Sequence, residues 1–539
     1  MHKRIVGADP RVRPWADTWV GPYSEDFETS AEKGTVMKRF GVLLAIVVLA
    51  MVAMWRGDAG AQAQGELLIR KATIVNAEGR TEGDIRIRGE KIAEIGRNLT
   101  AGSGAREIEA SGLVVLPGGI DPHVHPGQNF TAESAAALAG GVTTISTMIS
   151  AGSLGLGGGR GAATSNPVAN EDLAGAIRRT EEKIKKEAMA DFILHVIVND
   201  PEKRLNQLEG LLNTGQPSIK IFMNRPGFVE QERAYIALIR KAGEVGVLPL
   251  IHCEDDTLIN DIGQRFIAQG KGDIKYVNEA RPVLTEEVAT ERCVSFSEAT
   301  GAPVYIVHIS SERALRAAEV GRARGLPIFT EVRWIYLFLT DDIYKRDDRQ
   351  LYIGQPPYRK QTDVEYLWKG INNHTVDVVD TDHNTFTKEQ KMEPQTVLNH
   401  RAGMNGLQDF LPVIWDVGVN KKRINAETFV AITSANPAKL MGLYPQKGRI
   451  AVGSDADVIL WDPKETRTIR DQDELSVAAH SFIAGRSVTG WPRITIRRGE
   501  VVWENRQIKS TAGSGRLIPR HKFEKAWSSG AGATKSTQP

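Results

Sequence analysis

The chain has 539 residues, of which 41% are hydrophobic and 25% are charged, as in an ordinary globular protein. Its formal net charge of +2 gives no indication of a nucleic-acid or polyanion partner. The two cysteines, Cys253 and Cys293, belong to no C-x-x-C pair, so neither a zinc ribbon nor a disulfide framework is indicated.

Residues 1–63 are typical of an N-terminal extension followed by an export signal. A basic start at residues 37–39 precedes the uncharged residues 40–54, and two A-x-A cleavage sites follow between Ala59 and Ala63. The apolar run is short for a membrane span, which needs about 20 residues. We therefore expect a secreted or periplasmic protein without stable membrane association after signal cleavage. A retained membrane anchor is the alternative.

From residue 64 onward, short strands frame a long alternation of strands and helices. The framing strands are expected at 66–76, 84–88 and 91–95, and again at 457–461, 494–498 and 501–504. Between them, strands are predicted at 142–147, 191–198, 218–222, 248–252, 304–309, 327–330 and 376–381. Helices are predicted at 170–187, 230–244, 285–299 and 311–324. With the opening strand, the central part has the eight strands of a parallel (β/α)8 barrel.

The predicted fold is therefore α/β, a TIM-like barrel with a small β-sandwich domain built from both chain ends. The expected boundaries are 64–117 for the first part of the sandwich, 118–445 for the barrel and 446–505 for the second part. The tail, residues 506–539, is rich in Gly, Ser and Lys, and we expect it to extend over the surface or a neighbouring subunit.

The opening strand carries the first candidate metal ligands. The apolar run 113–116 and the stretch that follows it read as one buried strand that ends in Asp121-x-His123-x-His125. Because side chains alternate along a strand, His123 and His125 share one face and can bind one metal ion. For this motif alone, two packed or exposed histidines are the alternative.

Four further polar residues lie at the carboxyl ends of predicted barrel strands, the face where barrel enzymes place their sites. They are Lys220, His252, His308 and Asp382. Taken singly, a core histidine or a loop-capping aspartate has an ordinary structural explanation. A lysine inside an apolar strand is costly unless it is paired or used. Together with the opening strand that carries His123 and His125, five strand ends bear ligand-type residues. This number indicates a common site.

Several segments together resemble one known family. They are 117–125, 220–223, 308–311, 356–359, 381–386, 436–445, 447–448 and 453–457. In order and context they resemble the amidohydrolase superfamily, in its cyclic amidohydrolase branch of hydantoinases and dihydropyrimidinases, over roughly residues 66–505. The resemblance implies a metal-dependent hydrolase that opens a cyclic amide or ureide with a metal-bridging hydroxide. It also implies a homo-oligomer, often a tetramer.

The resemblance further implies two divalent metal ions, with Zn²⁺ as the expected element, and a CO2-derived carbamate on Lys220 that bridges them. By position, one ion would be held by His123, His125 and Asp382, and the other by His252 and His308. An unmodified lysine, with an ordinary pKa of about 10.4, is a poor metal ligand at neutral pH. Asp382 would be the catalytic residue that takes a proton from the hydroxide and passes it to the leaving nitrogen.

The chain departs from the family at expected substrate contacts. Arg225 stands five residues after Lys220, where the family usually has a tyrosine that hydrogen-bonds the oxyanion. Gln355 stands where a serine usually contacts the ring, and Arg333-Trp334 stands where the family often has Cys-Pro. We expect Arg225, a permanent cation with several donors, to favour an acidic group on the substrate. The alternative is that Arg225 turns away to a surface carboxylate, with Asn224 or a water at the oxyanion.

Two other functions stay open at the level of the sequence. One is hydrolysis of acyclic N-acyl or N-carbamoyl compounds on the same scaffold. The other is a non-catalytic dihydropyrimidinase-like interaction protein. Members of that kind have lost metal ligands, whereas this chain keeps all six.

Overall fold

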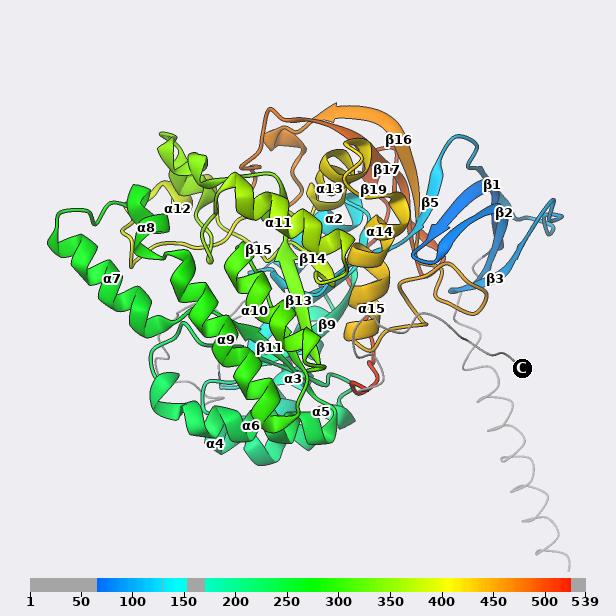
Figure 1. Cartoon of the computed structure of the whole chain (residues 1–539). Coiled ribbons are helices and arrows are strands. Elements are labelled where there is room, and N and C mark those ends of the chain that lie inside the picture. The colour runs from blue at the N-terminus through cyan, green and yellow to red at the C-terminus, as the bar shows by residue number, and fades with distance from the viewer. Residues whose placement is uncertain (1–64, 128, 153–169, 525–539) are drawn as a thin grey trace, which may run out of the picture. The chain divides into compact units, whose positions relative to one another are not determined.

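The computed structural model describes residues 65–127, 129–152 and 170–524 (Figure 1). The predicted export signal lies outside these ranges. Within them, no helix combines the length and apolar character that a membrane crossing requires. Cys253 and Cys293 are buried free thiols.

One sheet contains eight parallel strands in an order that follows the chain, which is the topology of the predicted barrel. In spatial order the strands are β6 (Gly119–Asp121), β8 (Val142–Ser150), β9 (Asp191–Ile197), β10 (Ser218–Phe222), β11 (Leu248–His252), β12 (Val304–Ile306), β13 (Ile328–Arg333) and β14 (Val378–Asp380). Every residue of β9 is buried, as expected for a parallel strand that is covered on both faces.

Helices cover the outside of this sheet (Figure 1). The α-helices of the described residues are α2 (Phe130–Ala139), α3 (Leu173–Ile184), α4 (Pro201–Arg204), α5 (Leu208–Asn213), α6 (Glu232–Val245), α7 (Asp256–Ala268), α8 (Val277–Ala280), α9 (Val283–Thr300), α10 (Glu312–Ala323), α11 (Gln361–Asn372), α12 (Lys388–Met392), α13 (Phe410–Ile414), α14 (Ala426–Val430) and α15 (Asn436–Leu440). Among them, α3 packs on β8 and β9, α6 on β11, α9 on β12 and α10 on β13. Helix α10 begins after the N-cap Ser311, whose hydroxyl accepts from the Ala314 amide.

The first and last barrel strands approach each other through a separate pair of short strands. Strand β7 (Val124–His125) pairs in parallel with β15 (His383–Asn384). The Thr381 hydroxyl also donates to Asp121 Oδ2 at 2.6 Å. These contacts bring the segment that carries His123 and His125 beside the segment that carries Asp382.

A second sheet contains nine strands from both ends of the chain. In spatial order they are β3 (Lys91–Gly96), β2 (Gly79–Arg88), β1 (Leu67–Asn76), β5 (Val114–Pro117), β16 (Val458–Thr468), β17 (Ser487–Arg497), β18 (Glu500–Glu504) and β19 (Gln507–Ile508), with β4 (Arg106–Glu109) beside β1. The pairs β1–β5 and β1–β4 are parallel and the other pairs are antiparallel. The predicted fold class, a barrel with a smaller β-domain from both chain ends, is confirmed.

The expectation of one continuous opening strand is wrong. Residues 113–125 instead form β5 in the nine-stranded sheet, β6 in the barrel and β7 in the two-stranded pair. The change of sheet occurs at Gly118, where a Cβ atom would lie only 2.2 Å from Thr143 Oγ1. Close packing of the backbone on the neighbouring strand, which glycine permits, thus divides an apolar run that reads as uninterrupted.

The described part of the tail packs on its own chain, at the amino-terminal ends of the barrel strands. The Ile518 amide donates to the Phe192 carbonyl at 2.9 Å, and the Phe523 amide donates to the Gly246 carbonyl at 2.9 Å. The side chains of Ile518 and Phe523 are buried. Up to residue 524, the tail therefore covers the end of the barrel opposite the predicted site.

Candidate active site

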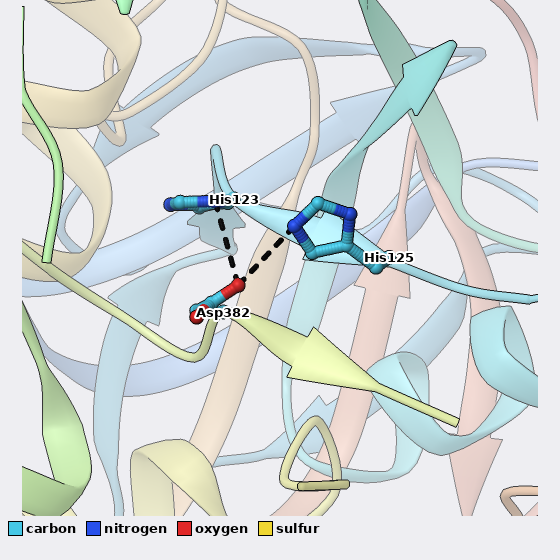
Figure 2. A group of neighbouring side chains, drawn as sticks. All are labelled: His123, His125 and Asp382. Carbon is cyan, nitrogen blue, oxygen red and sulfur yellow. Dashed lines mark ion pairs between the residues drawn. The ribbon is translucent and has the colours of Figure 1, made fainter. Parts of the chain in front are cut away.

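Three of the predicted ligands meet beside the β7–β15 pair (Figure 2). The Nε2 atoms of His125 and His123 lie 3.2 Å and 3.4 Å from Asp382 Oδ1. His123 lies between β6 and β7, outside both strands, whereas His125 ends β7. Asp382 has a φ of 44°, an uncommon conformation for a non-glycine residue that is frequent at functional sites.

The other three predicted ligands lie on or directly after the neighbouring barrel strands β10, β11 and β12. Lys220 on β10 is fully buried, and its Nζ lies 3.3 Å from His123 Nε2. His252 ends β11, and its ring centroid lies 4.3 Å from that of His308. The His308 ring lies 5.4 Å from that of His123. The structure thus brings all six predicted residues to one place at the carboxyl ends of the strands.

Buried carboxylates orient these histidines, and the sequence analysis missed their role. Glu331 Oε1 lies 2.8 Å from His123 Nδ1 and accepts from the His308 amide at 2.9 Å. Glu254 Oε2 lies 2.8 Å from His252 Nε2 and pairs with Arg281 Nη2 at 2.6 Å. A carboxylate behind a ligand imidazole fixes the ring and its tautomer, which is the usual arrangement around protein-bound metals.

Burial sets the protonation of the site. It lowers the pKa values of the His123, His252 and His308 imidazoles, with Lys220 contributing in each case, so these rings are neutral and able to bind a metal. Burial also lowers the pKa of the Lys220 ammonium to about 8. It acts to raise the pKa of the Asp382 carboxyl, but the positive charge of Arg333 opposes it, and that pKa lies well below its ordinary value.

The donor atoms fit a metal centre. His123, His125 and Asp382 offer ligand atoms within 4.8 Å of one another, and His308 Nδ1 is buried without a hydrogen-bond partner in the described part of the chain. Imidazole nitrogen and carboxylate oxygen suit zinc and related divalent ions. A second group, His123, Glu331 and Asp380, uses the opposite ring nitrogen of His123, which Glu331 already contacts. We therefore interpret Glu331 and Asp380 as carboxylates that orient the His123 ring, and not as ligands of a second metal site.

A cavity of about 570 Å³ opens over these residues. It is lined by five of the predicted ligands (His123, His125, His252, His308 and Asp382), and by Arg225 and Gln355. Its outer wall is formed by residues 393–395 and 398–403, most of them polar. Lys391 anchors this wall, because its buried ammonium donates to the carbonyls of Ile353, Arg401 and Gly403 at 2.9, 2.7 and 2.9 Å.

Both predicted substrate contacts reach the cavity. The half-buried Arg225 stacks its guanidinium on the Phe222 ring, 3.8 Å from the centroid, and donates to Asn199 Oδ1 at 3.1 Å. Gln355 Nε2 lies 2.8 Å from His400 Nε2, and Gln355 Oε1 accepts from Asn224 Nδ2 at 3.5 Å. Phe222 and Asn199 thus hold the Arg225 guanidinium beside the cavity.

Comparisons with known proteins agree with this architecture. The model of the amidohydrolase family matches residues 114–502. A D-hydantoinase from Rhizobium radiobacter is 31% identical over 476 residues, which cover 85% of this chain and 100% of the relative. The crystal structure of a dihydropyrimidinase from Brevibacillus agri superposes with a TM-score of 0.78 at 31% identity, covering 85% of this chain and 100% of that one. An L-hydantoinase from Arthrobacter aurescens gives a TM-score of 0.75 at 26% identity, over 84% of this chain and 99% of that one. The chain therefore belongs to the amidohydrolase family, in the branch of hydantoinases and dihydropyrimidinases.

Proposed function

We propose that this protein is a metal-dependent hydrolase that opens a cyclic amide or ureide of the hydantoin or dihydropyrimidine type. The observation that carries the proposal is the convergence of six ligand-type side chains at the carboxyl end of a barrel whose relatives are hydantoinases and dihydropyrimidinases. The complete set of ligand-type residues disfavours a non-catalytic interaction protein. Acyclic N-acyl or N-carbamoyl compounds are the second substrate class to test.

The metal centre is proposed to hold two divalent ions, with Zn²⁺ as the element. His123, His125 and Asp382 would bind one ion and His252 and His308 the other, with a carbamate on Lys220 between them. When bound, such ions polarise an amide carbonyl and supply hydroxide at neutral pH. The donor set and the buried, unpartnered His308 Nδ1 support this assignment.

Lys220 is proposed to react with CO2, with a new N–C bond formed and one amine proton released. Only the neutral amine carries the lone pair that forms this bond. Burial lowers the pKa of Lys220 to about 8, which raises the neutral fraction near pH 7 compared with an ordinary lysine. The carbamate would then carry the anionic oxygens that an unmodified lysine lacks.

Asp382 is proposed to move the proton during ring opening. Its Oδ1 faces the two imidazoles, beside the cavity where water and substrate meet. As water adds its oxygen to the carbonyl carbon, Asp382 accepts a proton. It returns the proton to the ring nitrogen when the C–N bond breaks, so that a protonated leaving nitrogen and a carboxylic acid result, and the acid then releases its proton to solvent.

The direct test is ring opening by purified protein. Dihydrouracil and hydantoin are offered beside an acyclic N-carbamoyl amino acid, before and after chelation and after addition of Zn²⁺. We expect ring opening that chelation removes and Zn²⁺ restores. Hydrolysis of the acyclic compound alone would favour the second class, and no turnover of any compound by metal-loaded protein would contradict the proposal.

Arg225 and Gln355 are proposed as substrate contacts, with Arg225 selecting a ring that carries a carboxylate. The stacked guanidinium is a fixed cation that can pair with such a group in a bidentate manner. We expect Arg225→Tyr to lower the ratio of kcat/KM for a carboxylated ring to that for an uncharged ring by roughly 10-fold or more, since a charge-assisted hydrogen bond contributes about 1.5–3 kcal/mol. Steady-state kinetics with dihydroorotate and dihydrouracil measure this ratio.

The matched control for that substitution is Arg233→Tyr, at an exposed position on α6. It should leave the ratio unchanged. If Arg225→Tyr also leaves the ratio unchanged, Arg225 has a structural role in the loop after β10. Ring opening of dihydrouracil by both forms would leave the proposed function intact in that case.

Export is proposed from the basic and apolar pattern of residues 37–54, with cleavage after Ala61 or Ala63. The expected result is a mature protein that begins at residue 62 or 64 in the secreted or periplasmic fraction. N-terminal sequencing of that fraction measures it. A sequence that begins upstream of Phe40 would refute the prediction and favour a membrane anchor.

The mature protein is proposed to be a homo-oligomer that needs no nucleic acid or stable membrane contact. Its support is the resemblance to the hydantoinase branch alone. Sedimentation of the purified protein tests it.

A further inference from the structure

Arg333, the last residue of β13, places a fully buried guanidinium beside Asp382. Its Nε lies 3.4 Å from Asp382 Oδ2. Its Nη1 donates to the Tyr336 hydroxyl at 3.4 Å, and a Cβ atom on Gly354 would lie only 2.6 Å from Nη1. The surrounding chain therefore packs closely around this guanidinium and leaves it little room to move.

Asp382 is the counter-ion of this arginine. Burial acts to lower the pKa of Arg333, but the Asp382 carboxylate outweighs it and raises that pKa. Tyr336, Tyr358 and Lys391, which also interact with the guanidinium, carry no negative charge at neutral pH. In the described part of the chain, Nε and Nη2 of Arg333 have no hydrogen-bond partner. Such donors are costly to bury, so the ion pair with Asp382 is what compensates the charge.

The two oxygens of Asp382 have different neighbours. His123 and His125 both face Oδ1, whereas Arg333 faces Oδ2. The terminal torsion of an aspartate is broad, so without such a contact the carboxylate can rotate and can bind a metal through both oxygens. A buried arginine beside Oδ2 restricts the rotation of the carboxylate and the binding of a metal through both oxygens.

We propose that Arg333 is a positioning residue that holds Oδ2 of Asp382, so that Oδ1 alone faces the metal centre and the water whose proton Asp382 accepts. This inference rests on the proposed metal-dependent hydrolysis and adds a residue to it. Arg333 does not line the cavity, so it acts through Asp382 and not on the substrate. Arg333 stands where the family often has a cysteine, so its contact with Asp382 is a feature of this chain's own sequence.

The kinetic test removes the guanidinium while keeping an unbranched side chain that reaches the position of Nε. Arg333→Met should lower kcat by roughly 10²-fold, the cost of displacing a catalytic group by about 1 Å, with KM changed by less than about threefold. Arg333→Lys, which keeps the charge, should fall between the wild type and Arg333→Met. The control Arg316→Met, at an exposed position on α10, should change neither constant.

Chemical rescue distinguishes the effect of the positive charge of Arg333 from the effect of the space that its side chain fills. Arg333→Ala leaves a space with the shape of guanidinium, which is also the shape of urea. Low-millimolar guanidinium should raise kcat of this variant by roughly 10-fold, whereas urea should not. Equal rescue by the two compounds would overturn the proposal, because it would show that Arg333 only fills space.

A third readout does not depend on turnover. The Co²⁺-loaded wild type and Arg333→Met should differ in the intensity of their visible absorption, because an Asp382 that binds through both oxygens raises the coordination number. In the Asp382→Asn background, the substitution at position 333 should change nothing. Identical Co²⁺ spectra and identical kcat in the wild type and Arg333→Met would overturn the proposal.

Two controls distinguish a failure of the Arg333 proposal from a folding defect and from a failure of the proposed function. If Arg333→Met does not fold, Arg333→Lys and Arg333→Gln carry the same comparison, with the lysine variant expected closer to the wild type in kcat and Co²⁺ spectrum. Equal values for these two variants would count against a charged contact with Asp382. Failure of the wild type to open any cyclic amide would contradict the proposed function, and the Co²⁺ spectra would still decide the role of Arg333.

Discussion

Asp382→Asn should lower kcat for ring opening by roughly 10³- to 10⁴-fold and leave the fold intact. The amide has nearly the shape of the carboxylate, so packing around residue 382 is kept. It cannot accept the proton of the attacking water, and general acid–base catalysis alone contributes about 10²- to 10⁴-fold. The weaker metal ligand adds to this loss. Steady-state kinetics on metal-loaded protein and the thermal unfolding curve measure the two effects.

The control for this substitution is Asp342→Asn, at an exposed position that pairs with Lys345. It should leave kcat and Tm unchanged. Wild-type turnover by Asp382→Asn would defeat the proposed proton transfer, whereas a collapsed Tm would show that Asp382 is needed for folding.

Lys220→Ala should lose bound metal and activity together. Alanine cannot form the carbamate, so the two ions would lose their shared anionic ligand. A loss of several kcal/mol in transition-state stabilisation corresponds to roughly 10³-fold in kcat. Acetate or propionate should partly restore both metal content and kcat, because a small carboxylate fits the vacated space and supplies similar oxygens. Elemental analysis and kinetics, with and without the added acid, measure this.

The control is Lys241→Ala, on α6 and paired with Glu209. It should keep full metal content. A Lys220→Ala protein that retains two ions and wild-type kcat would show that the lysine is not a ligand, and the carbamate would have to be abandoned.

The convergence of the six predicted ligands was predictable because the carboxyl ends of parallel strands meet at one end of a barrel. Lys220 and His252 illustrate this, since β10 and β11 pair directly and in parallel. The contact with Asp382 depends instead on the β7–β15 pair, which joins segments more than 250 residues apart. Short strands of two residues leave no periodicity in the sequence, so this pair could not be predicted.

The residues that orient the metal ligands also could not be predicted from the sequence. Glu254 lies two residues after His252, but its role depends on Arg281, which lies between α8 and α9. Arg333 stood out as a departure from the family, yet its contact with Asp382 follows from tertiary packing. Similarly, residues 113–125 read as one strand because local hydrophobicity does not show where a chain changes sheets.

The most direct test of this account is the native mass of the intact mature protein, prepared without chelators and with CO2 present. We expect the mass of the polypeptide plus two divalent ions and one carbamate per chain, with all three additions lost in Lys220→Ala. A wild-type protein that opens cyclic amides while carrying a bare Lys220, or fewer than two ions, would contradict the proposed metal centre.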